Sequence, residues 1–222
     1  MSTIKRIILG LLAVGVIYIL GGAILSDLVF AQPKIDYANY FRPGDKLFSR
    51  AEGFDQTVLS VGNGWLQTRL VVLPNAAGPP EHFHEAFEEK FTVKSGTLSI
   101  LVSGEKRTLH AGETISIPPM TKHKPFNETA ETVIVESDDP KTLPVEFGYL
   151  LSQLYGFMDT YPNGPGVPRI MMQLSVYGTD ADSWIADGPP LPVQKTMRFV
   201  IAPTARLLGY KKFYPQFKPN GG

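Results

Sequence analysis

Two histidines separated by one residue are the first feature of this sequence that points to chemistry. They are His82 and His84, and in a β-strand the side chains at positions i and i+2 lie on the same face. Both imidazoles can therefore reach one metal ion. Five residues later Glu89 begins a run in which Glu89, Phe91 and Val93 share a face. A carboxylate at the head of an apolar inward face is costly unless it is paired or bound to a metal.

A third histidine, His123, follows a strand-like run and a turn that contains two prolines. The chain has no cysteine, which excludes disulfides, thiolate nucleophiles and cysteine-based metal sites. Three imidazoles and one carboxylate suit one divalent transition metal, either Fe, Mn, Ni, Cu or Zn. Glu88 is the alternative carboxylate, and we prefer Glu89 because its phase along the strand matches the apolar face. The fourth histidine, His110, has no motif partner and is expected at the surface.

The elements that must position these side chains are predicted to be short strands. Several runs rich in β-branched and aromatic residues are separated by glycine-containing turns, which is typical of an antiparallel sandwich or barrel. These runs are Trp65–Leu73, Lys90–Val93, Thr97–Val102, Thr114–Ile117 and Thr132–Val135.

The order and spacing of these residues resemble the two motifs of the cupin superfamily. The first motif is represented by His82-x-His84, four residues, Glu89, six residues and Gly96. The second is represented by Gly112, five residues, Pro118-Pro119-Met120, two residues, His123, three residues and Asn127. Fifteen residues separate the motifs, as in compact single-barrel cupins. The sequence departs from the family pattern at Met120, where the second motif has a glycine.

The resemblance covers residues 55–137 and implies a mainly β fold, a single antiparallel jelly-roll barrel of the type-2-like conserved kind. It implies that the metal ligands are His82, His84, Glu89 and His123, with Glu89 also acting as a catalytic base. Four residues near the motifs are candidate substrate contacts: Phe91, Met120, Phe126 and Asn127. Core packing is the alternative for the two phenylalanines, and a structural role in a turn is the alternative for Asn127.

An uncharged run of twenty residues near the N-terminus predicts a transmembrane or signal helix. As a helix the run from Ile7 to Ser26 measures about 30 Å, which matches the hydrocarbon core of a bilayer. Lys5 and Arg6 precede it, so the positive-inside rule places the folded domain on the extracytoplasmic side of a single-pass anchor. The alternative is a signal peptide cleaved near Ala31, which leaves a secreted or periplasmic protein.

Changes in composition divide the chain into four parts. We expect an anchor or signal helix over residues 1–31, a linker over 32–50, the cupin barrel over 51–140 and a short helical, basic extension over 141–222. In the extension, Val145–Met158 and Arg169–Tyr177 have helical patterns, and Pro203 is expected to start or break a helix. Residues 195–217 mix basic and apolar side chains. They are expected either to contact an anionic membrane or to pack on the barrel or in a homodimer.

The overall composition narrows the function. The 21 basic and 21 acidic residues cancel, which argues against a nucleic-acid-binding protein, and 43% hydrophobic residues are enough for a sizeable core. The interpretation is a membrane-tethered, extracytoplasmic metal-binding cupin that acts on a small apolar or aromatic molecule. A dioxygenase-type oxidoreductase is the first hypothesis. A non-catalytic cupin that binds a small ligand and a metal-dependent isomerase or lyase are the alternatives.

Overall fold

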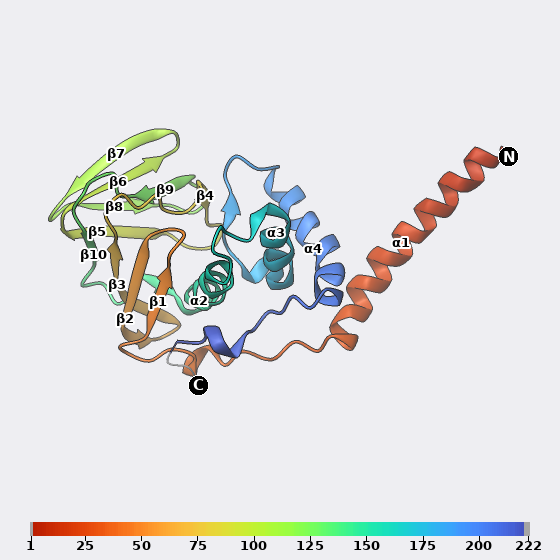
Figure 1. Cartoon of the computed structure of the whole chain (residues 1–222), viewed down its shortest axis with the longest axis horizontal. Helices are drawn as coiled ribbons and strands as arrows, with labels where there is room; N and C mark the ends of the chain where they lie inside the picture. The colour runs from red at the N-terminus through yellow and green to blue at the C-terminus, as the bar shows by residue number, and fades with distance from the viewer. Residues whose placement is uncertain (1, 220–222) are drawn as a thin grey trace.

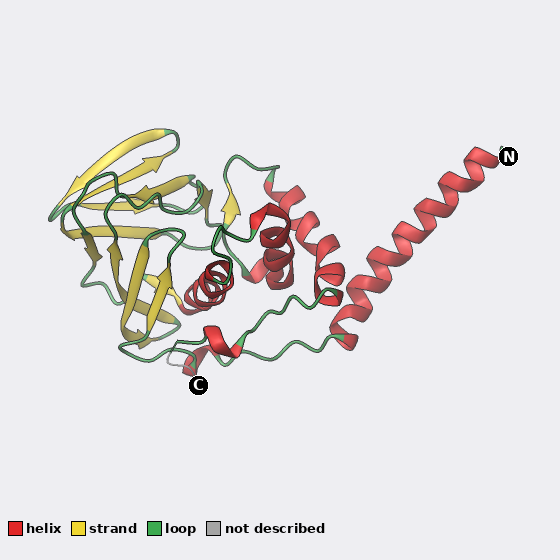
Figure 2. Cartoon of the chain, viewed as in Figure 1, coloured by secondary structure: helices red, strands yellow, loops and turns green. Residues whose placement is uncertain are grey.

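The computed structural model describes residues 2–219, which form two β-sheets and a group of helices (Figures 1 and 2). The helices are α1 (Thr3–Val29), α2 (Val145–Asp159), α3 (Gly166–Tyr177) and α4 (Leu191–Leu207), with 3-10 turns η1 (Tyr37–Asn39), η2 (Gly178–Asp180) and η3 (Pro215–Phe217). The strands are β1 (Lys46–Ser49), β2 (Phe54–Gly62), β3 (Trp65–Val72), β4 (His82–Phe83), β5 (Glu89–Ser95), β6 (Thr97–Val102), β7 (Glu105–His110), β8 (Thr114–Ile117), β9 (His123–Phe126), β10 (Val133–Glu136), β11 (Leu143–Pro144) and β12 (Trp184–Ile185).

The strands pair antiparallel in two separate sheets. One sheet has the order β1-β2-β3-β10-β5-β8, with β11 also paired to β3, and the other has the order β12-β4-β9-β6-β7. The predicted closed barrel is therefore wrong, because within residues 2–219 no strand pairing joins the two sheets. The chain changes sheet between β5 and β6 at a tight turn, where Gly96 has a φ of 81° and an added Cβ would lie 2.7 Å from the carbonyl oxygen of Thr132.

An apolar core lies between the two sheets. Alternate residues along β3 face inward, so that Leu66, Thr68, Leu70 and Val72 are all buried, as expected for strands with one face against a core. The core also contains Phe54, Phe91, Val93, Leu98, Ile100, Leu109, Ile117, Val133 and Val135. The predicted strand runs are thus confirmed, and it is the closure of the sheets that the sequence pattern did not reveal.

Part of the segment expected to be a linker belongs to the folded core. Lys46–Ser49 form β1 on the edge of the larger sheet, paired with β2. Tyr40 and Phe41 are 5% and 3% exposed and pack in a second apolar cluster with residues of α2. Tyr40 and Phe41 are therefore core residues, since burying each one removes a large apolar area from water.

The helical extension packs against the larger sheet through α2, which lies between the sheets and α3 in Figure 1. The predicted helices over Val145–Met158 and Arg169–Tyr177 are confirmed as α2 and α3. Gly148 lets α2 approach β3 closely, because an added Cβ would lie 2.6 Å from the Leu66 side chain. The extension is thus part of the same folded unit as the sheets.

Helix α4 continues through Pro203, contrary to the expectation that this residue starts or breaks a helix. The helix loses one backbone hydrogen bond there. The proline ring packs on Gly22 of α1. The two approach closely because Gly22 has no Cβ, which would lie 3.1 Å from the ring. The Tyr18 hydroxyl of α1 donates to the carbonyl of Val200 at 3.2 Å, so the two helices are joined at their crossing.

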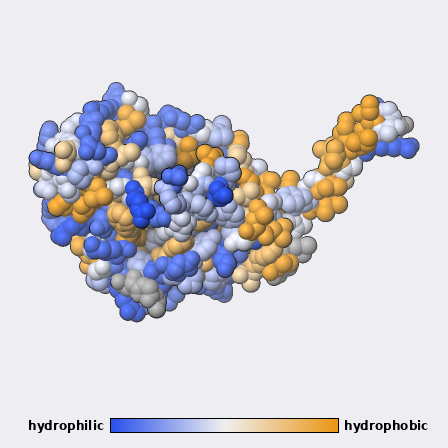
Figure 3. Space-filling model, in the orientation of Figure 1, coloured by the Kyte–Doolittle hydropathy of each residue, from blue (hydrophilic) through white to orange (hydrophobic). Residues whose placement is uncertain are grey.

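Helix α1 extends away from the rest of the molecule, with exposed apolar side chains that include Ile8, Leu12 and Ile17 (Figure 3). Within residues 2–219, however, no helix has the length and hydropathy required to cross a membrane. The predicted transmembrane helix over residues 7–26 is therefore not supported. The extracytoplasmic location, the membrane contact of residues 195–217 and the homodimer stay predictions.

Candidate metal centre and cavity

The fold brings the three motif histidines and Glu89 together. His82 lies on β4 directly opposite His123 on β9, while His84 follows β4 and Glu89 begins β5. One ligand atom from each of the four residues can be chosen so that all lie within 4.8 Å of one another. The three imidazoles are buried, with exposed fractions of 9% for His82, 2% for His84 and 1% for His123.

Each imidazole uses its Nδ1 atom for a hydrogen bond to a backbone carbonyl. The bonds join His82 to Pro80 (2.9 Å), His123 to Thr121 (2.9 Å) and His84 to Asp182 (2.5 Å). A carbonyl oxygen only accepts, so Nδ1 carries the proton in all three rings. This leaves each Nε2 available as a ligand, and outer bonds of this kind are what orients the histidines of metal sites.

The Glu89 carboxylate faces the free nitrogen atoms of two of these rings. Its Oε2 atom lies 2.7 Å from Nε2 of His123 and 3.3 Å from Nε2 of His84. Burial by itself raises the pKa of Glu89, but the bonds to His123 and His84 outweigh it and hold the pKa well below its usual range. The alternative ligand Glu88 is exposed, so the geometry favours Glu89.

The pKa values of the imidazoles differ because their surroundings differ. Burial, together with the neighbouring His84 and His123, lowers the pKa of His82 to about 3. Burial also lowers the pKa of His123, but its bond to Glu89 more than compensates, and the pKa is raised. His82 is therefore neutral at physiological pH, which is the form that binds a metal.

The donor set fits a divalent transition metal. The cluster offers three imidazole nitrogens and one carboxylate at or next to strand ends, without a sulfur ligand. Such a set suits Fe, Mn, Ni, Cu or Zn and does not choose among them. His110, the remaining histidine, is exposed on β7, as the sequence predicts.

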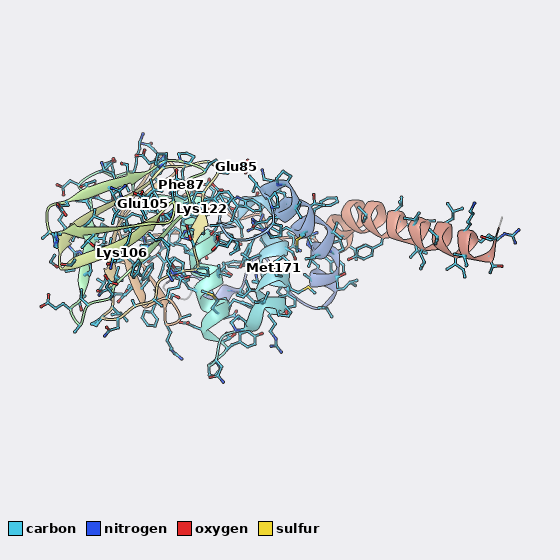
Figure 4. The ribbon with its side chains drawn as sticks, turned by 90° about the horizontal axis from the view of Figure 1, so that it is seen from above. Glu85, Phe87, Glu105, Lys106, Lys122 and Met171 are labelled. Atoms are coloured by element: carbon cyan, nitrogen blue, oxygen red, sulfur yellow. The ribbon has the colours of Figure 1, made fainter. Side chains whose placement is uncertain are left out.

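Aromatic rings pack against the candidate metal centre from the loop after β4 and from α2. The ring of Phe87 stacks on His84 with centroids 4.3 Å apart, and the ring of Phe147 meets His84 edge-on at 4.7 Å. Figure 4 labels Phe87 and Glu85 on this loop. The Glu85 carboxylate is on the outer side of the loop and pairs with Lys195 of α4 at 2.7 Å. These contacts fix the loop that carries His84.

A cavity of about 210 Å³ opens beside this centre, and both His82 and Glu89 line it. Its walls come from both sheets and from the helical extension, and apolar side chains predominate. From α2 and α3 these side chains are Phe147, Leu150, Leu151, Leu154, Met158, Ile170 and Leu174. The extension therefore completes a cavity that the two sheets leave open on one side.

The four predicted substrate contacts do not share one location. Phe91 lines the cavity. Met120, by contrast, is 54% exposed and has a φ of 64°, and neither it nor Phe126 is part of the cavity wall. Asn127 is buried and binds backbone, donating to the carbonyls of Leu73 (2.9 Å) and Glu131 (2.7 Å). The substrate role predicted for these three residues is therefore not supported, and the structural alternative for Asn127 is favoured.

Sequence reasoning missed two groups of residues around the site. The first is a clamp on the loop after β4, in which Asp182 binds both His84 and the backbone of that loop. The second is Glu52, a carboxyl group that lines the cavity and interacts with the Tyr155 side chain. Neither group forms a recognisable sequence motif, because its residues are far from the residues they contact. Asp182 and Tyr155 lie in the extension, and Glu52 lies in the turn between β1 and β2.

The clamp is anchored by a buried arginine. Arg198 of α4 is 4% exposed, donates to the carbonyls of Gly178 (3.1 Å), Ala181 (2.6 Å) and Ser183 (2.5 Å), and stacks on Trp184 at 3.8 Å. Strand β12 then pairs with β4, opposite His82 and Phe83. The extension thereby reaches the strand that carries the first histidine.

Known proteins resemble part of this chain. Residues 68–136 match the family model described as the cupin domain. No curated protein matches the chain. The matched residues form the central part of the chain and include all four candidate ligands.

Solved structures that resemble this chain cover less than half of it. KdgF from Halomonas sp. is 19% identical, with 40% of this chain and 81% of that chain covered at a TM-score of 0.36. A cupin-2 domain protein from Shewanella frigidimarina is 27% identical, with 37% and 78% covered at 0.32. Pac13 from Streptomyces, described as a nucleoside dehydratase, is 20% identical, with 46% and 82% covered at 0.35.

Proposed function

Starting from the cupin domain at residues 68–136, we propose that this chain is a metal-dependent oxygenase with a small, largely apolar substrate. The orientation of the three imidazoles carries this proposal. Each ring donates its Nδ1 proton to a backbone carbonyl. The Nε2 atoms of the three rings then lie close to one another and to the Glu89 carboxylate. Three buried imidazoles and a carboxylate whose ligand atoms lie within 4.8 Å of one another form an arrangement that a bound cation would stabilise.

His82, His84, His123 and Glu89 would hold the metal. A bound divalent transition metal supplies a redox centre and a Lewis acid. The residues of the chain do the rest. The apolar walls, including Phe91 and Phe147, would exclude water and orient the substrate, and Glu89, which lines the same cavity, would act as the base toward the substrate.

Metal analysis of the full chain, purified without a histidine tag, tests the metal site. After dialysis against Fe(II), Mn(II), Ni(II), Cu(II) or Zn(II), we expect about one ion per chain. The double variant His82→Ala/His123→Ala removes two ligands and should lose the ion. His110→Ala is the matched control, because this exposed histidine lies outside the site and should leave the metal content unchanged. Equal metal content in the double variant and the wild type contradicts the proposal.

A metal-dependent isomerase or lyase is the second candidate function, and Glu52 favours it. This carboxyl lines the same cavity as Glu89, and two carboxyls in different environments can divide acid and base roles. Oxygen uptake with one-ring substrates separates the two candidates. An oxygenase consumes oxygen with Fe(II), Mn(II), Ni(II) or Cu(II) and not with Zn(II), whereas an isomerase or lyase converts substrate with Zn(II) and without oxygen uptake.

A further inference from the structure

Besides His82 and Glu89, two residues outside the cupin domain contribute polar side chains to the cavity wall. Glu52 comes from the turn between β1 and β2, and Tyr155 comes from α2. Both line the cavity that His82 and Glu89 also line, and their side chains lie close enough to influence each other's pKa. Tyr155 is 4% exposed, so this interaction lies within the protein.

The charge of the cavity wall restricts what the cavity can bind. Among the described residues that line it, none is a lysine or an arginine, while Glu52 and Glu89 are both carboxylic acids. In the metal-free protein no basic side chain of the wall would compensate a bound anion, and burying an unpaired charge is strongly unfavourable. The wall is therefore suited to a ligand without negative charge.

Glu52 is available as a hydrogen-bond donor. Burial raises its pKa to about 7, against the opposing effect of the Tyr155 side chain and with added repulsion from Asp159 of α2 and Glu89 of β5. Below that pH the carboxyl keeps its proton. Of the other polar side chains in the wall, the Gln56 amide already donates to Thr68 at 2.8 Å. Besides the hydroxyl of Ser183, Glu52 and Tyr155 are the polar side chains outside the candidate metal centre that can meet a polar group of a ligand.

The volume sets the size of that ligand. The cavity measures about 210 Å³. An engineered apolar cavity of about 150 Å³ in another protein binds benzene, so the present cavity holds a single ring with a small substituent. We infer that Glu52 and Tyr155 bind the hydroxyl or carbonyl group of a neutral, one-ring substrate. This inference rests on the proposed function, because it assigns the substrate of that same site.

Ligand binding to the metal-free full chain tests the inference. Three probes of similar size are compared by calorimetry at about pH 6, where Glu52 keeps its proton: benzamide, which is neutral and polar; benzoate, which is its anionic counterpart; and toluene, which is apolar. We expect benzamide to bind at least about tenfold more tightly than benzoate. Tyr155→Phe and Glu52→Leu should each weaken benzamide by about fivefold or more without weakening toluene.

Glu88→Gln is the matched control, since this exposed carboxylate lies outside the cavity and its loss should change no affinity. Tyr155→Phe removes a single oxygen atom, so it keeps the test valid even when Glu52→Leu does not fold. Equal binding of benzoate and benzamide, equal weakening of toluene and benzamide in the variants, or binding of no probe would each overturn the inference. Because no metal is present, these results are independent of the metal analysis above.

Discussion

The carboxylate of Asp182 supports the candidate metal centre from the helical extension, and its removal has a calculable effect. The carboxylate accepts hydrogen bonds from the backbone N–H groups of Glu85 (2.7 Å) and Ala86 (2.8 Å) and from the indole of Trp184 (3.0 Å). The backbone carbonyl of the same residue accepts from Nδ1 of His84. Asp182 therefore holds both the loop and the ring that the loop carries.

Asp182→Ala removes three hydrogen bonds at once. Each such bond contributes about 1 kcal/mol net to stability, so the free energy of unfolding should fall by about 2–3 kcal/mol. The loop after β4 also loses its anchor next to His84. The backbone carbonyl that orients His84 remains, so metal binding should weaken by about tenfold at most, the lower end of the range for loss of an outer bond to a ligand. Asp182→Asn retains one acceptor oxygen and should show an intermediate loss of both quantities.

Two assays on the full chain measure these effects separately. Urea unfolding of the metal-free protein gives the stability, and competition with a chelator gives the metal affinity. Asp187→Ala is the matched control, because its carboxylate is 80% exposed and makes a 3.9 Å ion pair with Lys122. A surface pair of this kind contributes about 0–1 kcal/mol. If Asp182→Ala resembles Asp187→Ala in both assays, the reasoning about the clamp is refuted.

Three further predictions concern single residues and are checked by urea unfolding. Met120→Gly should raise the free energy of unfolding by about 1 kcal/mol, because Met120 has a φ of 64° that only glycine adopts without strain; an equal or lower value contradicts this. Asn127→Ala should lower it by about 2–4 kcal/mol, since the carbonyls of Leu73 and Glu131 lose a buried donor; a loss under about 0.5 kcal/mol argues against a structural role. The pKa of Glu52 is raised to about 7, so the folded state binds the extra proton and stability falls as pH rises toward 7. From about pH 5 to 8 the wild type should lose about 2 kcal/mol more than Glu52→Gln, and parallel pH profiles would contradict this.

The sequence predicted the four candidate ligands because their constraints are local. His82 and His84 are two residues apart on one strand, and Glu89 is fixed by the alternation of the next strand. Spacing of this kind determines which side chains share a face. All four positions lie within residues 68–136, which match the cupin domain.

The closure of the cavity could not be predicted, because it depends on contacts between distant segments. Tyr155 meets Glu52 across about half the chain, and Arg198 orders the carbonyls on either side of Asp182 only after α4 has packed. Helical periodicity shows that α2 and α3 exist, but it does not show which sheet they cover. The expected barrel failed for the same reason, since strand patterns do not record whether two sheets join at their edges.

Met120 and Phe41 lie in surroundings that the sequence did not predict, and each case has a local explanation. Met120 occupies a position where the family motif has a glycine, and it adopts the left-handed conformation that the glycine would have, with its side chain outside. The turn is therefore retained at the expense of strain, and His123 keeps its place. Phe41, expected in a linker, is buried against α2, because a large aromatic ring near a folded domain is stabilised by burial.

Location of the metal in a crystal of the full chain by anomalous scattering tests the central claim most directly. The ion should be found at about 2.0–2.2 Å from Nε2 of His82, His84 and His123 and from an oxygen of Glu89, with the Nδ1 bonds to the backbone unchanged. An ion bound elsewhere, or bound through other residues of the chain, would contradict the assignment of the metal centre.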